Sequence, residues 1–226
     1  MKKFWIVTIL LSGVVGAFAQ RGWEAGVGLG VAHYFGDLNT EFDLAEPGLS
    51  VSGIARYNFN HRLALKFAAS YGQIMADDAD SPNIYEQARN LNFESDIWDA
   101  AVQFEFNFMH YEHGSKDAFF SPYLFGGFNV FYFNPTTMHE GEAVELQPLG
   151  TEGQFRGEEY SRADLGLVYG GGIKVSVDYR WSLNLEISAR RLYTDYLDDV
   201  STVYADPDVL EDFRGPLAAE LADRSI

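Results

Sequence analysis

The 226-residue sequence contains no cysteine. A disulfide framework, on which many small exported proteins depend, is therefore excluded. A lipid anchor on a processed N-terminal cysteine is excluded for the same reason. Beyond its first 19 residues the sequence also lacks any apolar run of about 18 residues, so no later segment is a candidate for a membrane-spanning helix.

Basic residues are scarce. The sequence has 16 Lys and Arg against 33 Asp and Glu, a formal net charge of −17. A surface this acidic repels polyanions, so nucleic acid is excluded as a partner.

The N-terminus carries the three parts of a secretory signal in order. Lys2 and Lys3 precede the apolar run Phe4 to Val15, and Ala17-Phe18-Ala19 follows it. We expect a signal peptide over 1–19, cleaved between Ala19 and Gln20. Loss of the two lysines leaves 14 basic residues and a mature charge of −19.

Apolar and polar side chains alternate along several segments, the period of a β-strand with two different faces. In 96–108, Trp98, Val102 and Phe104 share one face, whereas Gln103 and Glu105 share the other. The same reasoning predicts seven strands, at 23–34, 49–59, 62–72, 96–108, 122–133, 164–178 and 182–194. The segment 122–133 is apolar on both faces, so its phase stays open.

Short and long connections alternate along the chain, so the long loops gather at one end. This predicts an all-β fold, a small antiparallel transmembrane β-barrel of eight strands similar to OmpA and OmpX, with the N-terminus periplasmic and the long loops extracellular. Only seven strands are identifiable, so we expect the closing strand to be missing. The predicted organisation is a signal at 1–19, a barrel at 20–194 and an acidic outer loop at 195–226, truncated before the last strand.

Alternation alone does not say which face is inside, so a soluble lipocalin-like barrel around a ligand is the rival fold. Aromatic residues at both ends of the apolar face favour the membrane barrel, because such belts match the two lipid–water interfaces. Outer-membrane lipids are then partners.

Charged side chains on the polar face are predicted to fill the lumen. Charges in a narrow barrel must pair, so we expect a structural network rather than a catalytic one. Its members are Glu24, Arg56, Lys66, Asp99, Glu105, Lys174, Glu186 and Arg190. No cofactor, metal ion or small-molecule substrate is expected. A diffusion pore is disfavoured, because side chains fill an eight-stranded barrel.

Catalysis is also disfavoured, because no set of nucleophile, base and orienting group is apparent. His61, His110 and His113 fall at the predicted periplasmic turns and His33 near the other end. His139 lies beside Glu140, Glu142 and Glu145, where a weak divalent-cation site is conceivable, although such clusters are usually solvated surface.

Six strings follow one another at characteristic spacing. They are Tyr34-Phe35-Gly36-Asp37-Leu38-Asn39, Ala55-Arg56-Tyr57-Asn58, Arg89-Asn90-Leu91-Asn92-Phe93, Ser121-Pro122-Tyr123-Leu124-Phe125-Gly126, Phe131-Tyr132-Phe133-Asn134-Pro135 and 190–201, which reads Arg-Arg-Leu-Tyr-Thr-Asp-Tyr-Leu-Asp-Asp-Val-Ser. With them the chain resembles the PorG-like outer-membrane barrels associated with the type IX protein secretion system.

The resemblance implies a non-enzymatic role, in which the barrel links the periplasmic ring or the translocon of the secretion machinery to the outer membrane. The partners would be those proteins, touching short periplasmic turns such as 109–120. A generic structural or adhesion-type OmpA-like barrel with acidic surface loops stays open as the alternative.

Overall fold

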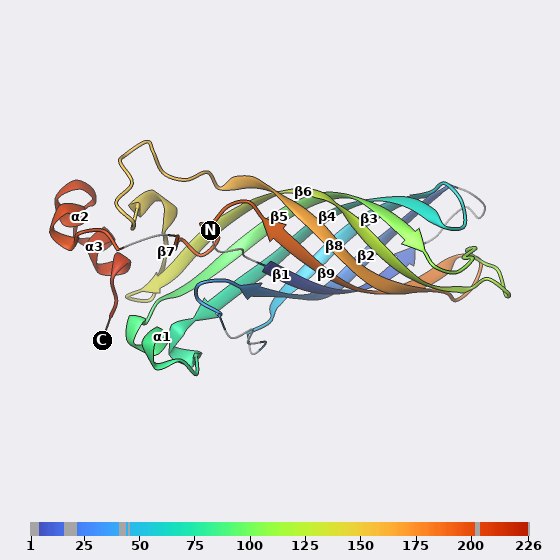
Figure 1. The fold of residues 1–226 in the computed structure, drawn as a ribbon, viewed down its shortest axis with the longest axis horizontal. Coiled ribbons are helices and arrows are strands. Elements are labelled where there is room, and N and C mark those ends of the chain that lie inside the picture. The colour runs from blue at the N-terminus through green and yellow to red at the C-terminus, as the bar shows by residue number, and fades with distance from the viewer. Residues whose placement is uncertain (1–4, 16–21, 41–43, 45, 202–203, 226) are drawn as a thin grey trace.

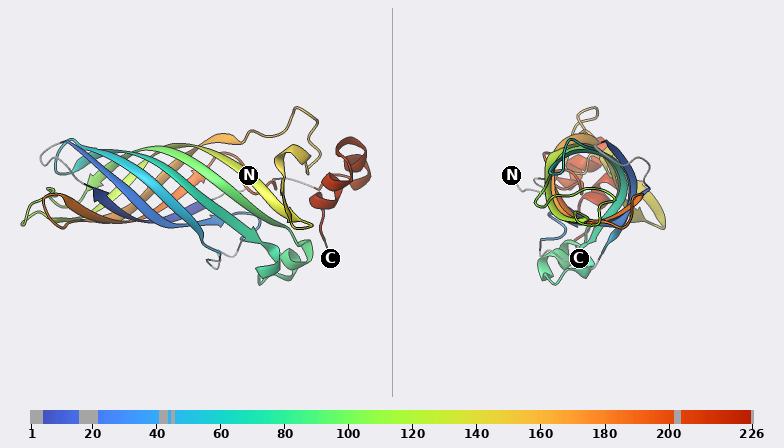
Figure 2. Two further views of the ribbon diagram at one scale, coloured as in Figure 1. Left: turned by 180° about the vertical axis from the view of Figure 1, so that it is seen from behind. Right: turned by 90° about the vertical axis from the view of Figure 1, so that its right-hand side faces the viewer.

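The computed structural model describes residues 5–15, 22–40, 44, 46–201 and 204–225. Its dominant element is a closed ring of eight antiparallel strands, which Figure 2 shows end-on. The strands are β1 (Trp5–Val15), β2 (Trp23–Phe35), β3 (Gly48–Asn58), β4 (Leu63–Asp77), β5 (Asn92–Asn107), β6 (Phe120–His139), β8 (Ala163–Ser176) and β9 (Trp181–Leu192). The predicted all-β small barrel is confirmed.

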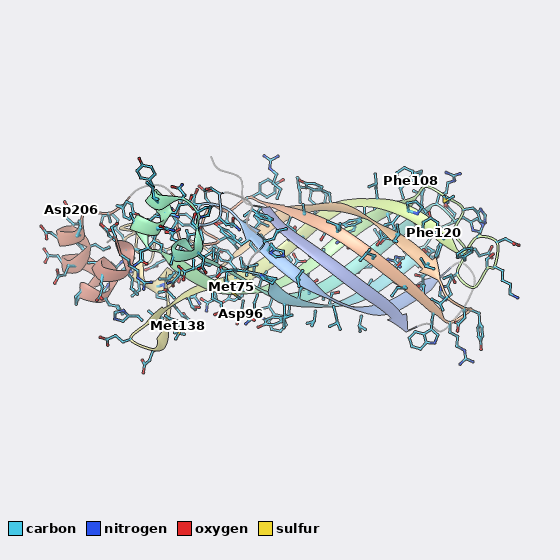
Figure 3. All side chains as sticks on the ribbon, turned by 90° about the horizontal axis from the view of Figure 1, so that it is seen from below. Met75, Asp96, Phe108, Phe120, Met138 and Asp206 are labelled. Carbon is cyan, nitrogen blue, oxygen red and sulfur yellow. The ribbon has the colours of Figure 1, made fainter. Side chains whose placement is uncertain are left out.

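The ring follows chain order, with β5 pairing β6 and β1 pairing both β2 and β9. One end carries the short turns 59–62 and 177–180 together with the loop 108–119, and we call it the short-turn end. Phe108 and Phe120 mark it in Figure 3. The other, the long-loop end, carries the remaining elements, which are α1 (Ile84–Arg89), β7 (Glu142–Glu145), α2 (Pro207–Arg214) and α3 (Pro216–Ala222), with the 3-10 turns η1 (Asp78–Asp80) and η2 (Gln147–Leu149) (Figure 1).

The eighth position in the ring is not vacant, contrary to expectation. β1, from the segment predicted to be a signal peptide, fills it and is antiparallel to both neighbours, with Leu11 opposite Leu29 and Leu185. The physical reason is backbone hydrogen bonding: without β1, the strands β2 and β9 would each present a row of unpaired N–H and C=O groups at an open sheet edge. Cleavage after Ala19 stays a prediction, because residues 16–21 lie outside the described part of the chain.

The apolar face of the barrel points outward. Leu29, Leu49, Phe104 and Phe128 are each 65–74% exposed, whereas Lys174 on the inner face is fully buried. The soluble lipocalin-like alternative, which needs the apolar face inside, is therefore wrong. Among the described residues, no helix is long and apolar enough to cross a membrane.

Aromatic rings on this face contact one another near both of its ends, either along one strand or between neighbouring strands. At the short-turn end the ring of Trp23 lies 5.3 Å from that of Tyr57, and Phe106 and Phe108 meet edge to face at 5.4 Å. Toward the other end Tyr71 lies 4.9 Å from Trp98. The two pairs that join neighbouring strands, Trp23 with Tyr57 and Tyr71 with Trp98, lie directly opposite each other in the sheet and therefore favour the observed register.

The segment 195–226, expected to be an acidic loop without regular structure, carries two short helices. Asp206 caps α2 by accepting the backbone N–H groups of Asp208 and Val209, and Pro207 occupies its first turn. Leu210 of α2 and Leu221 of α3 are buried. The two helices therefore pack by their apolar residues at the long-loop end.

Candidate functional site

Six of the eight predicted lumen charges form one connected network in the half of the barrel near the short-turn end. Glu105 lies at its centre and is fully buried. One of its oxygens lies 2.8 Å from Arg56 Nε and 2.5 Å from Lys174 Nζ, and the other lies 3.5 Å from Lys66 Nζ. A single carboxylate thus contacts three cations from three strands.

Two further carboxylates complete the network. Lys66 Nζ lies 2.6 Å from Glu186, which also accepts the Tyr123 hydroxyl at 2.7 Å. Arg56 Nη1 lies 3.0 Å from Glu24, which accepts Asn58 Nδ2 at 2.6 Å. Three acidic and three basic groups therefore balance one another without a counter-ion.

The other two predicted residues form a separate pair nearer the long-loop end. Arg190 Nη2 lies 3.2 Å from Asp99 Oδ1, and Asn129 donates to the other oxygen of Asp99 at 2.5 Å. The pair links β5 to β9 across the lumen, because these strands are not neighbours in the ring.

Aromatic rings of β6 cover the lumen lysines, which explains why this strand is apolar on both faces. The ammonium of Lys66 lies 4.4 Å from the ring centre of Phe125, and that of Lys174 lies 4.4 Å from Tyr123. Cation–π attraction of this kind strengthens when water is excluded. Charged and aromatic side chains together thus occupy the interior of this half of the barrel.

A second site, missed by the sequence analysis, is a cavity of about 210 Å³ at the long-loop end. Its polar lining includes Asp37, Arg89, Asp198 and Asp199, and its apolar lining includes Leu221. These residues come from the separate loops that follow β2, β4 and β9, so only the folded barrel brings them together.

Two neighbouring carboxyl groups in the cavity wall are buried against hydroxyl groups. Tyr34 donates to Asp198, while Thr151 and Tyr160 each donate to Asp199 at 2.5 Å. Burial raises the pKa of Asp198 well above its usual range and that of Asp199 to about 6. Near neutral pH the wall can therefore bind or release a proton.

Arg89, which also lines the cavity, forms a salt bridge that holds α1 against the barrel. Arg89 donates to both oxygens of Asp78, at 2.7 and 2.6 Å, and to the Asp37 carbonyl oxygen at 2.9 Å. Asp78 also accepts the backbone N–H of Leu91 at 2.9 Å. The bidentate geometry gives the loop after β4 a fixed conformation.

Strings that are far apart in the sequence meet around this cavity. Tyr34 contacts Phe93 edge to face at 4.9 Å and reaches Asp198, which connects three of the six strings. Phe133, from a fourth, stacks on Tyr160 at 6.0 Å. The long-loop end is thus where the residues that carry the resemblance concentrate.

Of the histidines considered as catalytic or metal-binding groups, His33 is buried in β2. His139 Nδ1 lies 3.9 Å from Glu220, while nearby Glu145 pairs with Arg162 at 2.7 Å. Within the described residues, His139 is not part of a group with metal-ligand spacing. His61 and His110, by contrast, are in direct contact.

The profile of a protein family described as a domain of unknown function, DUF6089, matches residues 2–214. The chain belongs to the DUF6089 family. No curated protein sequence matches it.

Solved structures of low sequence identity are similar to this DUF6089 chain over most of its length. OprG of Pseudomonas aeruginosa is 10% identical, with a TM-score of 0.37 over 84% of this chain and 93% of that one. The attachment invasion locus protein Ail of Yersinia pestis is 10% identical, with a TM-score of 0.34 over 85% and 99%. Neisserial surface protein A is 13% identical, with a TM-score of 0.33 over 84% and 97%.

Proposed function

We propose that this DUF6089 chain is a non-enzymatic, integral outer-membrane barrel that acts through protein contacts rather than by passing solutes. The observation that carries the proposal is the filled lumen, in which Glu105 binds three cations from three strands. A barrel plugged by a neutral, buried network is a rigid anchor and not a channel. Its outward apolar band suits contact with outer-membrane lipids.

The specific role we propose is in the type IX protein secretion machinery, where the barrel links the periplasmic ring or the translocon to the outer membrane. The resemblance to PorG-like barrels supports this role. Residues from four of its six strings lie at the long-loop end, where Tyr34 contacts Phe93 and Asp198. We propose that this end contacts the translocon, whereas the periplasmic ring contacts the short turns such as 109–120. In the membrane the long loops would face the exterior and the short turns the periplasm.

Affinity purification tests the secretion role. The tagged chain is purified from gently solubilised outer membranes, and co-purifying proteins are identified by mass spectrometry. Ring or translocon proteins are expected in stoichiometric amounts. A barrel recovered alone, with its fold intact, would refute the secretion role.

A matched pair of variants tests which end of the barrel contacts the secretion proteins. Tyr34→Phe removes the hydroxyl that binds Asp198 at the long-loop end, whereas Tyr179→Phe changes an exposed ring at the short-turn end. If the long-loop surface contacts the translocon, only Tyr34→Phe lowers the yield of translocon proteins. Equal losses from both variants would argue against this surface.

The alternative is a structural or adhesion-type barrel, and the acidic long-loop end favours it. Asp206, Asp208 and Glu211 of the α2 region are all exposed at that end. In this case, removal of 204–225 abolishes surface attachment while the barrel still assembles and secretion continues.

A further inference from the structure

Two connections at the short-turn end bring three metal-binding side chains together. His61 lies in the turn between β3 and β4, whereas His110 and Glu112 lie in the loop between β5 and β6. The two imidazole rings stack with their centres 3.8 Å apart, and His110 Nε2 lies 4.0 Å from Glu112 Oε2. One ligand atom from each of the three residues lies within 4.8 Å of the others.

The backbone around these residues is fixed before any ion binds. Tyr111, between His110 and Glu112, is buried with its ring 6.0 Å from the ammonium of Lys174. Because alternate residues of an extended segment point to the same side, burial of Tyr111 leaves its two neighbours on the exposed side. The Glu112 N–H donates to the Ala118 carbonyl oxygen at 2.9 Å, which holds the loop from its other arm.

Backbone and side-chain hydrogen bonds join the two connections. The Tyr111 N–H and Asn107 Nδ2 donate to the His61 carbonyl oxygen at 3.4 and 3.3 Å. The Asn107 N–H donates to the Arg62 carbonyl oxygen at 2.7 Å. The positions of the three side chains relative to one another therefore depend on the barrel's register and not on chance contact between mobile loops.

We propose that His61, His110 and Glu112 form a binding site for a divalent transition-metal ion of the Zn²⁺ class. Two imidazole nitrogens and one carboxylate oxygen are the ligand types that Zn²⁺ prefers, and a fourth position is left to water. Bonds of about 2.0–2.1 Å in a tetrahedral arrangement require the ligand atoms to approach one another, which rotation of the three partly exposed side chains allows. Ca²⁺ and Mg²⁺ select oxygen-only sites and would not bind here.

The neighbouring charges are compatible with a bound cation. Arg62 is the adjacent cation, and its Nη1 donates to the Phe108 carbonyl oxygen at 3.4 Å. Glu112 supplies the anionic ligand, and the acidic chain as a whole attracts cations. An ion bound to all three residues would clamp the β3–β4 turn to the β5–β6 loop, and this clamp is independent of the secretion role.

Zn²⁺ titration of the full chain, purified in detergent with a tag that contains no histidine, tests the proposal. We expect one equivalent to bind with a dissociation constant in the micromolar range and to raise the thermal midpoint of the barrel. Co²⁺ in place of Zn²⁺ should give the visible absorption of a four-coordinate site. Mg²⁺ should do neither.

Three variants complete the test, and heat-modifiable migration in SDS gels verifies that each folds. His110→Ala and Glu112→Gln should weaken Zn²⁺ binding by at least about tenfold, because loss even of a partner outside the ligand shell typically costs about 10–100-fold in affinity. His139→Ala removes a histidine from the opposite end and should bind as the unmodified chain does. Absence of saturable binding, or equal affinity in all variants, would overturn the proposal.

Discussion

Replacement of Glu105 by Gln tests whether the lumen network holds the barrel together. Glu105 and Gln are nearly equal in size, but the amide carries no charge and turns an N–H₂ group toward at least one of three cations. Arg56, Lys66 and Lys174 would then lie together with only Glu24 and Glu186 to neutralise them. Loss of one partner from a buried ion pair costs about 3–5 kcal/mol, so we expect a loss of stability in that range.

The assay is reversible urea unfolding of the full chain in lipid vesicles, followed by tryptophan fluorescence. Glu94→Gln is the control, because it makes the same change on an exposed residue of the same strand, β5. We expect it to change the free energy of unfolding by less than about 0.5 kcal/mol. If Glu105→Gln is equally mild, the network contributes little to stability and the reasoning fails.

A second variant separates charge imbalance from lost packing. Lys174→Met removes one of the cations left unpaired by Glu105→Gln while keeping an unbranched side chain. If imbalance is the cause, the double variant is more stable than the sum of the two single effects, with a coupling of about 0.5–3 kcal/mol. Strict additivity would assign the loss to packing alone.

Three further predictions concern other parts of the chain. Because burial raises the pKa of Asp199 to about 6 from 3.8, its carboxyl stabilises the long-loop end below pH ~4, and this contribution, about 3 kcal/mol, is lost as the pH rises through 6. Protease resistance of 193–225 should therefore be greater at pH 5 than at pH 7.5. In Asp199→Asn the difference in resistance between the two pH values should shrink to the part that Asp198 contributes. A pH-independent cleavage rate in the unmodified chain would contradict this prediction. Leu197→Ala, at a fully buried position, should cost about 2–5 kcal/mol and speed hydrogen exchange at the long-loop end, whereas unchanged exchange would show that Leu197 does not stabilise this end. Gly127→Ala places a methyl group 2.0 Å from the Val102 carbonyl oxygen and should weaken the β5–β6 pairing, whereas Gly126→Ala meets nothing within 4 Å and should be tolerated; equal unfolding midpoints would refute the difference.

The strands were predictable because a two-sided sheet imposes a period of two on the sequence. The segment 96–108 anticipates β5 (Asn92–Asn107) with the correct alternation. In β6 the period continues beyond the predicted end at 133, with Thr137 buried and Met138 exposed. The predicted strand ends too early because Asn134 and Pro135 resemble a turn signal, although Pro135 lies within β6.

β1 was not predictable as a strand from local pattern. Its apolar run matches the core of a signal peptide and a buried strand equally well. The choice between them depends on which strand edges are unpaired elsewhere in the fold. The residues of the run itself carry no information about those edges.

The identity of the lumen charges followed from alternation, but their pairing did not. Glu105 and Lys174 are 69 positions apart, and their contact depends on the radius of the ring and on the register of strands that are not neighbours. The cavity at the long-loop end was missed for the same reason, since Asp198 and Asp199 lie in a segment that looks like a solvated acidic loop. The start of α2 did have a signal, because Asp206 followed by Pro207 is a typical helix beginning.

Strand length also determines what a partner would encounter at the long-loop end. A bilayer requires only about 9–11 residues of a tilted strand, yet β5 has 16 and β6 has 20. The surplus residues project as a paired β-wall that carries α1 and β7 beyond the apolar band. A partner would bind a platform ordered in advance, without the entropic cost of fixing long loops, so fast association and weak dependence on loop sequence are expected.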